Sequence, residues 1–251
     1  MNKNKKTVLV FASISLILAI LIISLFGNSK RNDAVEWVEN NGGLVQYKNF
    51  ELINSLPRFL GKFLSNFTTV DAIYISRTNI SEISPIQNFK HLKWLYINGT
   101  QASDISILSE LHALEEVHLH NTQIHDLSPL ENLSKLTVIS ASNTNIINLS
   151  PIANLTNLVK LKISQTNIKS LSHISNLKKL RELSFSDTMI DDLSPLKGLS
   201  QLERVHMKNT KVQDISVLQD LNNLKLLDVT GINEEEVILI KSQKLNLKII
   251  H

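Results

Sequence analysis

Residues 114–133 read LEEVHLHNTQIHDLSPLENL, and variants of this stretch recur every 22 residues along most of the chain. Three columns of apolar residues share this period, at positions 1, 4 and 6 when Leu114 is counted as position 1. The columns are Val70, Leu92, Leu114, Leu136, Leu158, Leu180, Leu202 and Leu224 at position 1; Ile73, Leu95, Val117, Ile139, Leu161, Leu183, Val205 and Leu227 at position 4; and Ile75, Ile97, Leu119, Ala141, Ile163, Phe185, Met207 and Val229 at position 6. A period kept over eight copies predicts a solenoid, in which each copy forms one coil and packs against its neighbours.

Within each copy, the spacing L-x-x-L-x-L predicts a short strand, because strand side chains alternate between a buried and an exposed face. A threonine follows the predicted strand in the first seven copies, where the chain turns inward. These threonines are Thr78, Thr100, Thr122, Thr144, Thr166, Thr188 and Thr210. We expect their hydroxyls to be buried and to bond backbone groups of their own and the adjacent coil, in a ladder along the solenoid.

A serine column lies further along each copy, and proline follows the serine in four copies. The serines are Ser84, Ser106, Ser128, Ser150, Ser172, Ser194 and Ser216. Serine followed by proline is typical of a helix N-cap and the first helical position. Few residues remain before the next strand, so this pattern predicts a 3-10 helix or a single α turn.

The repeat resembles the leucine-rich repeat family, in the 22-residue form of internalin-type bacterial surface proteins. The motif L-x-x-L-x-L-x-x-T-x-I-x-D-L-S-P-L-x-x-L at 114–133 carries the resemblance, which covers residues 70–231, with threonine where the more familiar pattern has asparagine. It implies an α/β solenoid: a right-handed horseshoe with a parallel β-sheet on the concave face and short 3-10 or α turns on the convex face. For function it implies a binding surface and no particular partner.

The N-terminal segment accounts for the basic character of the chain. The formal net charge is +3 and the pI is near 9, but residues 1–31 hold five basic residues and no acidic one. The other 21 basic and 23 acidic residues leave residues 32–251 with a net charge of −2. No consistent basic stripe remains, so we expect no nucleic-acid partner.

Residues 7–26 form an uncharged, mostly apolar run that is long enough to cross a bilayer as a helix. We expect an uncleaved signal anchor, with residues 1–6 as a cytoplasmic tail, because three lysines precede the run and two basic residues follow it. The bulk of the chain would then lie outside the cytoplasm. A cleaved signal peptide is the alternative, although the run exceeds the usual apolar length and lacks a good cleavage site.

Residues 27–69 would form a linker and an N-terminal cap, because an open solenoid exposes its leucine columns to water. We expect a short helix over 33–40, a stop at Gly42-Gly43, a brief strand over 44–47 and a second helix over 56–67. This order after a membrane span resembles that of membrane-anchored bacterial leucine-rich repeat proteins of unassigned function.

Residues 232–251 would form the C-terminal cap. Asn233 followed by three glutamates predicts a capped helix start. Leu245, Leu247 and Ile249 then alternate as a last strand, and we expect the domain to end at His251.

Side chains at positions 3, 5, 7 and 8 would face outward and line the concave face, and the candidate binding residues come from positions 3, 5 and 7. Tyr74, Trp94 and Tyr96 fall on two adjacent strands, about 4.8 Å apart, and exposed aromatic residues are frequent interface anchors. Alternatively, the N-terminal cap folds over these aromatics and makes them part of the core. The full candidate set is Tyr74, Trp94, Tyr96, Glu116, His118, His120, Lys160, Lys162, Arg204 and His206.

No catalytic centre, metal site or cofactor is expected. Glu116, His118 and His120 share one strand face at a spacing that could offer metal ligands, but a flat strand rarely brings three side chains to one ion. The absence of cysteine removes disulfides, thiolate sites and cysteine nucleophiles. Seven scattered glycines form no phosphate loop, and neither H-E-x-x-H nor G-x-S-x-G occurs.

The sequence therefore predicts a membrane-anchored, extracytoplasmic module that binds a protein or peptide on its concave face. One alternative is a secreted adhesin or effector that is released after signal-peptide cleavage. Another is a structural or regulatory component of the bacterial envelope. The sequence gives no indication of the oligomeric state.

Overall fold

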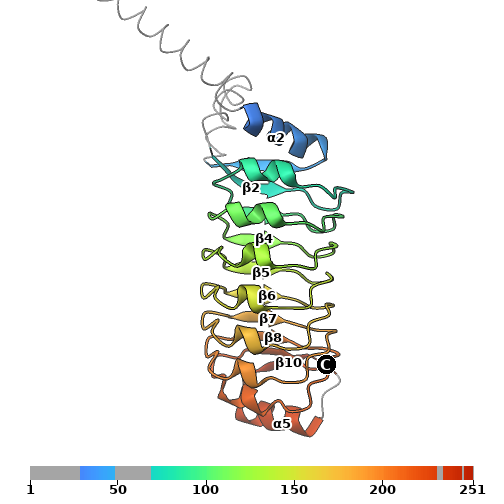
Figure 1. The fold of residues 1–251 in the computed structure, drawn as a ribbon. Helices are drawn as coiled ribbons and strands as arrows, with labels where there is room; N and C mark the ends of the chain where they lie inside the picture. Colours follow the sequence, from blue (N-terminus) through green and yellow to red (C-terminus); the bar gives the residue numbers. More distant parts are fainter. Residues whose placement is uncertain (1–28, 49–68, 231–233, 245, 251) are drawn as a thin grey trace, which may run out of the picture.

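The structure is a computed structural model that describes residues 29–48, 69–230, 234–244 and 246–250. Successive coils stack from helix α2 (Ser29–Asn40) at one end to helix α5 (Glu234–Gln243) at the other (Figure 1). The predicted span at 7–26 and the predicted helix at 56–67 lie outside the described residues. Among the helices that are described, none is both long and apolar enough to span a membrane.

Each repeat contributes one short strand to an open sheet, and the strands follow one another in chain order. The strands of the repeats are β2 (Val70–Tyr74), β3 (Trp94–Tyr96), β4 (Glu116–His118), β5 (Val138–Ser140), β6 (Lys160–Lys162), β7 (Glu182–Ser184), β8 (Arg204–His206) and β9 (Leu226–Asp228). All of them pair in parallel, and residues 22 apart lie opposite each other, as Val117 does with Ile139. The sequence period is therefore the register of the sheet.

The other side of each coil holds a short 3-10 helix (Figure 1). These helices are η1 (Ser84–Asn88), η2 (Ser106–Glu110), η3 (Ser128–Leu130), η4 (Ser150–Ile152), η5 (Ser172–Ile174), η6 (Ser194–Leu196) and η7 (Ser216–Asp220). An open parallel sheet backed by 3-10 turns confirms the predicted leucine-rich repeat solenoid.

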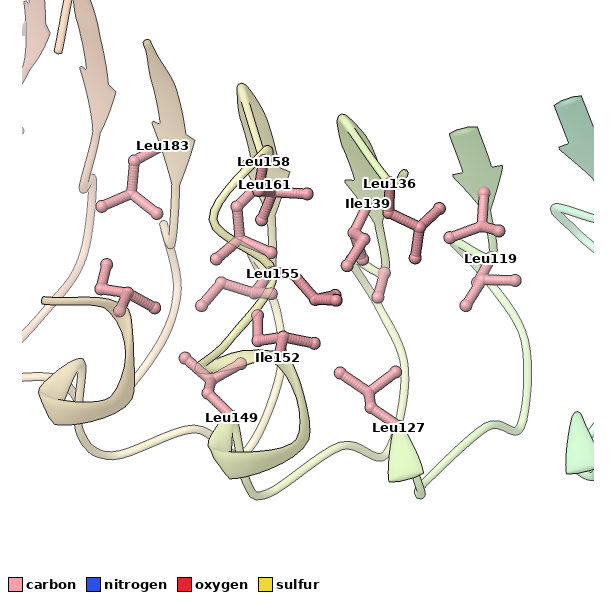
Figure 2. Close-up of a cluster of buried hydrophobic side chains, with 14 of the residues drawn as sticks. Leu119, Leu127, Leu136, Ile139, Leu149, Ile152, Leu155, Leu158, Leu161 and Leu183 are labelled. Carbon is pink, nitrogen blue, oxygen red and sulfur yellow. The ribbon is translucent and has the colours of Figure 1, made fainter. Parts of the chain in front are cut away.

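The three apolar columns form one continuous core between the strands and the 3-10 helices. Every residue of positions 1, 4 and 6 is buried, including Ala141 and Phe185, which fill the same position in different coils. Figure 2 shows Leu136, Leu158 and Leu161 pointing into this space from the strand side, with Ile152 facing them from η4. The core prediction is confirmed, and a 22-residue coil has room for both small and large side chains at one position.

Five threonines of the column, Thr100, Thr122, Thr144, Thr166 and Thr188, are buried as predicted, whereas Thr78 and Thr210 are half-buried. The hydrogen bonds of the column agree with the prediction in part, because they reach the backbone of the same coil. Thr122 Oγ1 donates to the carbonyl of Leu119 at 2.6 Å, and Thr166 Oγ1 donates to that of Ile163 at 2.7 Å. These bonds close a turn within one coil and do not reach the next coil, so the prediction of a threonine ladder was wrong. The corresponding oxygen of Thr78, in the first coil, is buried without a partner among the described residues.

Neighbouring coils are joined by backbone bonds, including those at position 8, one residue before each threonine. The N–H of Asn121 donates to the carbonyl of Ser142 at 3.0 Å, and that of Asn143 donates to Ser164 at 2.8 Å. The position-8 residues of the first seven coils have a left-handed backbone, with φ between 52° and 71°. They are Arg77, Gly99, Asn121, Asn143, Gln165, Asp187 and Asn209. Asn, Asp and Gly adopt this region most readily, so the column's composition was the available signal.

The serine column begins the 3-10 helices, but the serines are not N-caps. Ser128 is the first helical residue, and its N–H donates to Oδ1 of Asp126 at 2.8 Å. Ser194 repeats this arrangement with Asp192 at 2.7 Å. The capping prediction was wrong because the acidic side chain two residues earlier accepts the free N–H and closes a local turn.

At the N-terminal end, α2 lies against η1 and buries Ala34 and Val38 in the core. Strand β1 (Leu44–Tyr47) pairs antiparallel with β2, so the sheet is parallel except at this edge. Gly43 lies between these elements, where an added Cβ would lie 2.8 Å from side-chain atoms of Val38 and Ile75. The glycine is required by this close approach of α2 to the first coil.

At the C-terminal end, α5 packs against η7 and buries Val237 and Ile240. Strand β10 (Lys248–Ile250) then pairs in parallel with β9 and continues the sheet. Asn233, the expected helix cap, lies outside the described residues.

Replacing Leu161 by alanine should lower the free energy of unfolding by about 2–5 kcal/mol, because the side chain is fully buried at position 4 and its removal leaves a cavity. The measurement is urea denaturation of the full chain. Ile147→Ala is the matched control: Ile147 is 70% exposed, so its removal should change stability by less than about 0.5 kcal/mol. Equal effects of the two substitutions would contradict the assignment of the core.

Candidate functional site on the concave face

The candidate site occupies the sheet face that points away from the core, which we call the concave face. Alternation along each strand turns position 4 inward and positions 3 and 5 outward, as the buried Val117 between the half-buried Glu116 and His118 illustrates. Because strands pair with a shift of one repeat, side chains at the same position line up across neighbouring coils. The surface chemistry is therefore determined column by column.

At position 5, three aromatic rings on β2, β3 and β4 form a continuous stack. The ring centroids of Tyr74 and Tyr96 are 4.6 Å apart with planes inclined by 18°, and those of Tyr96 and His118 are 4.2 Å apart at 12°. The parallel register places the three residues directly opposite one another. We call Tyr74, Tyr96 and His118 the ring stack.

Hydrogen bonds hold the ring stack upright. Tyr74 Oη donates to Gln46 Oε1 on β1 at 3.1 Å, and Tyr96 Oη donates to Glu116 Oε2 at 3.4 Å. His118 Nε2 lies 3.3 Å from the same Glu116 oxygen. Burial, Glu116 and Tyr74 raise the pKa of Tyr96 to about 12, so its hydroxyl keeps its proton and remains a donor. Burial lowers the pKa of His118 against the opposing effect of Glu116.

Trp94 lies next to the ring stack, at position 3, and is not stacked with it. It pairs with Ala72 on one side and with Glu116 on the other, and Lys93 Nζ lies 5.8 Å from the centre of its ring. Tyr74, Trp94 and Tyr96 are all partly exposed. Strand β1 extends the sheet beside β2, and residues 49–68, the rest of the predicted cap, lie outside the described residues.

Further along the sheet, three cations surround one carboxylate. Glu182 Oε2 lies 3.2 Å from Lys160 Nζ and 3.1 Å from Arg204 Nη1, and its Oε1 lies 2.9 Å from Lys162 Nζ. We call these four residues the charge cluster; its formal charge is +2, from three cations and one anion. Burial tends to raise the pKa of Glu182, but hydrogen bonds from Lys162 and Lys160 outweigh it and lower the pKa to about 2.

Sequence reasoning selected the three cations and missed Glu182 as their common partner. The available signal was the position-3 column, in which Lys160, Glu182 and Arg204 follow one another on adjacent strands. Opposite charges directly across a strand pair are expected to interact. The side chain of Glu182 is only 9% exposed, so the carboxylate lies beneath the cations.

Between the ring stack and the charge cluster lies a hollow of about 470 Å³, which we call the central depression. Its floor is Ser140 and Ser142, and its walls are His118 and His120 on one side and Lys160 and Lys162 on the other. It forms where the short side chains of Ser140 and Ser142 lie between the histidines of the preceding coil and the lysines of the following coil.

His120, in this wall, has a buried ring nitrogen without a hydrogen-bond partner among the described residues. Burial, followed by nearby His118 and Lys162, lowers the pKa of His120. The buried nitrogen is Nδ1. Elsewhere in the position-7 column serine hydroxyls bond the next coil: Ser142 Oγ accepts from the N–H of Ser164 at 3.2 Å. His120 directly precedes this run of serines in the position-7 column, beside the central depression.

The predicted residues thus fall into neighbouring groups that span β2 to β8. Glu116 joins the ring stack to the central depression, and Arg204 belongs to the charge cluster. His206 lies apart from both, with Nδ1 at 3.8 Å from Asp228 Oδ2. Within the described ranges, no three His, Asp or Glu side chains come together as metal ligands.

Comparisons with known proteins show which proteins share this architecture. A sequence profile described as Leucine Rich repeats (2 copies) matches residues 156–198. The crystal structure of an internalin (inlF) from Listeria monocytogenes superposes on 68% of this chain, with a TM-score of 0.64 and 29% identity. In fold and repeat pattern the chain is similar to internalins and other bacterial leucine-rich repeat proteins.

Two further structures support the same fold. Internalin C2 from Listeria monocytogenes matches 75% of this chain and 82% of its own, with a TM-score of 0.68 and 25% identity. A leucine-rich repeat protein from Leptospira interrogans matches 78% of this chain at 21% identity and a TM-score of 0.67, covering 51% of that protein. The chain likewise spans about half of the inlF structure, 51%. No curated protein gives a significant sequence match.

Replacing Glu182 by glutamine should destabilise the protein at pH 7 by about 1–2 kcal/mol. This is less than the full pKa shift would represent, because the surrounding cations are partly exposed and screened. The folded pKa lies below the unfolded one, so the stabilisation is present above about pH 4.5 and is lost as the pH falls toward 2. The difference between wild type and variant should therefore shrink between pH 7 and pH 3 in urea titrations.

Glu110→Gln provides the matched control. Glu110 pairs with Lys90 at 3.5 Å, and both side chains are exposed, so its loss should cost about 0–0.5 kcal/mol. A Glu182→Gln effect that does not change with pH would show that its ionised carboxylate is not the source of the stability.

Proposed function

We propose that this protein is a membrane-anchored, extracytoplasmic module that binds a protein or peptide on its concave face. The observation that carries the proposal is the continuous run of ring stack, central depression and charge cluster across strands β2 to β8. Most of the other face of each strand is committed to the core, so the concave face is where side-chain identity is free to vary.

Pre-organisation supports a binding role for these residues. The tyrosines are held by stacking and by bonds to Gln46 and Glu116, and the lysines are held by Glu182. Side chains already fixed in place lose less conformational entropy when a partner docks. Aromatic and cationic groups on one surface also match the composition of many interface hot spots.

The membrane anchor is included in the proposal because of the sequence of the N-terminal segment. Residues 7–26 would span the membrane, 27–69 would form linker and cap, 70–231 the repeats and 232–251 the C-terminal cap. A secreted adhesin or effector, and a structural or regulatory envelope component, are the competing roles. Each of these roles uses the same non-enzymatic concave face, and they differ in whether the N-terminal segment is retained and in the partner.

Partner capture through the concave face can be tested with a photo-crosslinking amino acid in living cells. Placed at Ser142, on the floor of the central depression, the crosslinker should give a discrete protein adduct. Placed at Ile147, which is exposed outside the concave face, it should not. Trp94→Ala and Tyr96→Ala should each reduce the Ser142 adduct about tenfold, as expected for interface anchors, whereas exposed Met189→Ala should leave it unchanged. An adduct only from Ile147 would reject a concave-face site.

Topology can be tested separately with reporters fused to the C-terminus. Alkaline phosphatase, which needs an oxidising compartment, should be active, because the positive-inside bias places the repeats outside the cytoplasm. A green fluorescent protein fusion is the control with the opposite compartment preference. Inactive phosphatase would overturn the proposed orientation, and a mature N-terminus beginning after residue 26 would favour the secreted alternative.

A further inference from the structure

The central depression is bordered by more positive than negative charge. Lys160 and Lys162 each contact Glu182, but an ammonium group has three N–H donors, so both retain donors beyond that contact. Glu116, on the opposite wall, is engaged by Tyr96 and His118. The lysine side chains are 37% and 40% exposed and line the hollow. An anionic group in the depression would complete the pairing of these lysines.

The form of the site favours one carboxylate over a polyanion. The carboxylates of Glu116, Glu182 and Asp228 are interspersed with the cations along the sheet, and they would repel a chain of phosphates. The remaining lining is neutral and polar: the serine hydroxyls of the floor and two histidines whose pKa values are lowered, mainly by burial. A single acidic side chain fits a hollow with a few donors on one wall.

The ring stack offers a second, different contact close to the first. Its rings stand face to face, so their faces cover one another and their edges point outward. Ring edges carry partial positive charge and attract the face of another aromatic ring. An aromatic side chain laid across these edges would bury them, with Trp94 alongside on β3.

The sheet sets the distance between the two contacts. Strands lie about 4.8 Å apart, so β3 is about 10 Å from β5 and about 14 Å from β6. An extended peptide advances about 3.3 Å per residue, which corresponds to three or four residues between the two contacts.

We propose that the partner presents an extended segment that crosses the strands of the concave face, with an Asp or Glu carboxylate in the central depression against Lys160 and Lys162 and an aromatic side chain three or four residues away on the ring stack. This rests on the proposed function and specifies its ligand class: an acidic–aromatic peptide motif. His118 belongs to both contacts, since it ends the ring stack and forms a wall of the depression. The two contacts are therefore expected to act together.

The test is selection of a random eight-residue peptide display library on the full chain in detergent micelles, with empty micelles for counter-selection. Acidic and aromatic residues separated by three or four positions should be enriched at least about tenfold over the naive library. In a selected synthetic peptide, replacing the acidic residue by its amide should weaken binding about tenfold, the loss of a charge-assisted contact. Peptide chemistry alone is changed in this comparison, so protein folding is unaffected.

Protein variants then locate the contact. On Lys162→Met, the acidic and amide peptides should bind within about twofold of each other, because the charged partner is gone. Lys225→Met is the matched control: Lys225 also pairs with a glutamate of a neighbouring coil, Glu203 at 3.0 Å, but does not line the depression. The tenfold preference for the acidic peptide should persist there. Thermal unfolding monitored by circular dichroism establishes that both variants fold.

Several outcomes would overturn the inference. They are the absence of enriched peptides, enrichment without acidic residues, an unchanged preference in Lys162→Met, and displacement of the peptide by a single-stranded oligonucleotide or by inorganic phosphate at equal concentration. In each case a concave-face adduct from the Ser142 crosslinker would leave the proposed function standing. Loss of that adduct would instead reject the function itself.

Discussion

The constraint on which the structure depends is that no single coil can bury its own leucines. Each coil closes its core only against the next, through the apolar columns and through backbone bonds at position 8. Those bonds use a left-handed residue in each of the first seven coils, and six of these seven residues are not glycine. The burial of a continuous core outweighs this local backbone cost, which is of the order of 1 kcal/mol per residue. Keeping the 22-residue period is thus required for the coils to bury their leucines against one another.

The same register produces the candidate site. Because residues 22 apart lie opposite each other, like positions meet at the spacing of neighbouring strands, which is close enough for rings to stack and charges to pair. Tyr74, Tyr96 and His118 form a stack only because the core fixes the strands in this alignment. The depression arises by the same rule, since short side chains on β5 lie between long ones on β4 and β6. Stability and recognition therefore share one geometric cause.

The sequence predicted the parts of the fold that depend on periodicity. Strand positions, buried columns and 3-10 turns follow from spacing alone, because each is a feature of a single repeat that recurs in the other repeats. The predictions failed where a polar group had two possible partners: Thr122 bonds its own coil, and Ser128 is held by Asp126. The spacing predicts that such a group is buried or lies in a turn, but the local geometry determines which partner it bonds. The antiparallel pairing of β1 was also not predictable, because β1 lies outside the repeat and the 22-residue period does not determine its register.

For the site, sequence reasoning found the residues and missed their relations. Selecting by column recovered the aromatics and cations but did not make Glu182 a candidate. Its negative charge differs from that of its neighbours, and this is why the cations gather around it. The serines of β5 carried no signal individually, and their significance is that they leave space. In a solenoid, uniform columns such as positions 1 and 4 serve the core, whereas columns that change along the chain give each strand of the surface a different chemistry. The order of those changes, aromatic, then small, then charged, is therefore the property of this chain that a partner can recognise.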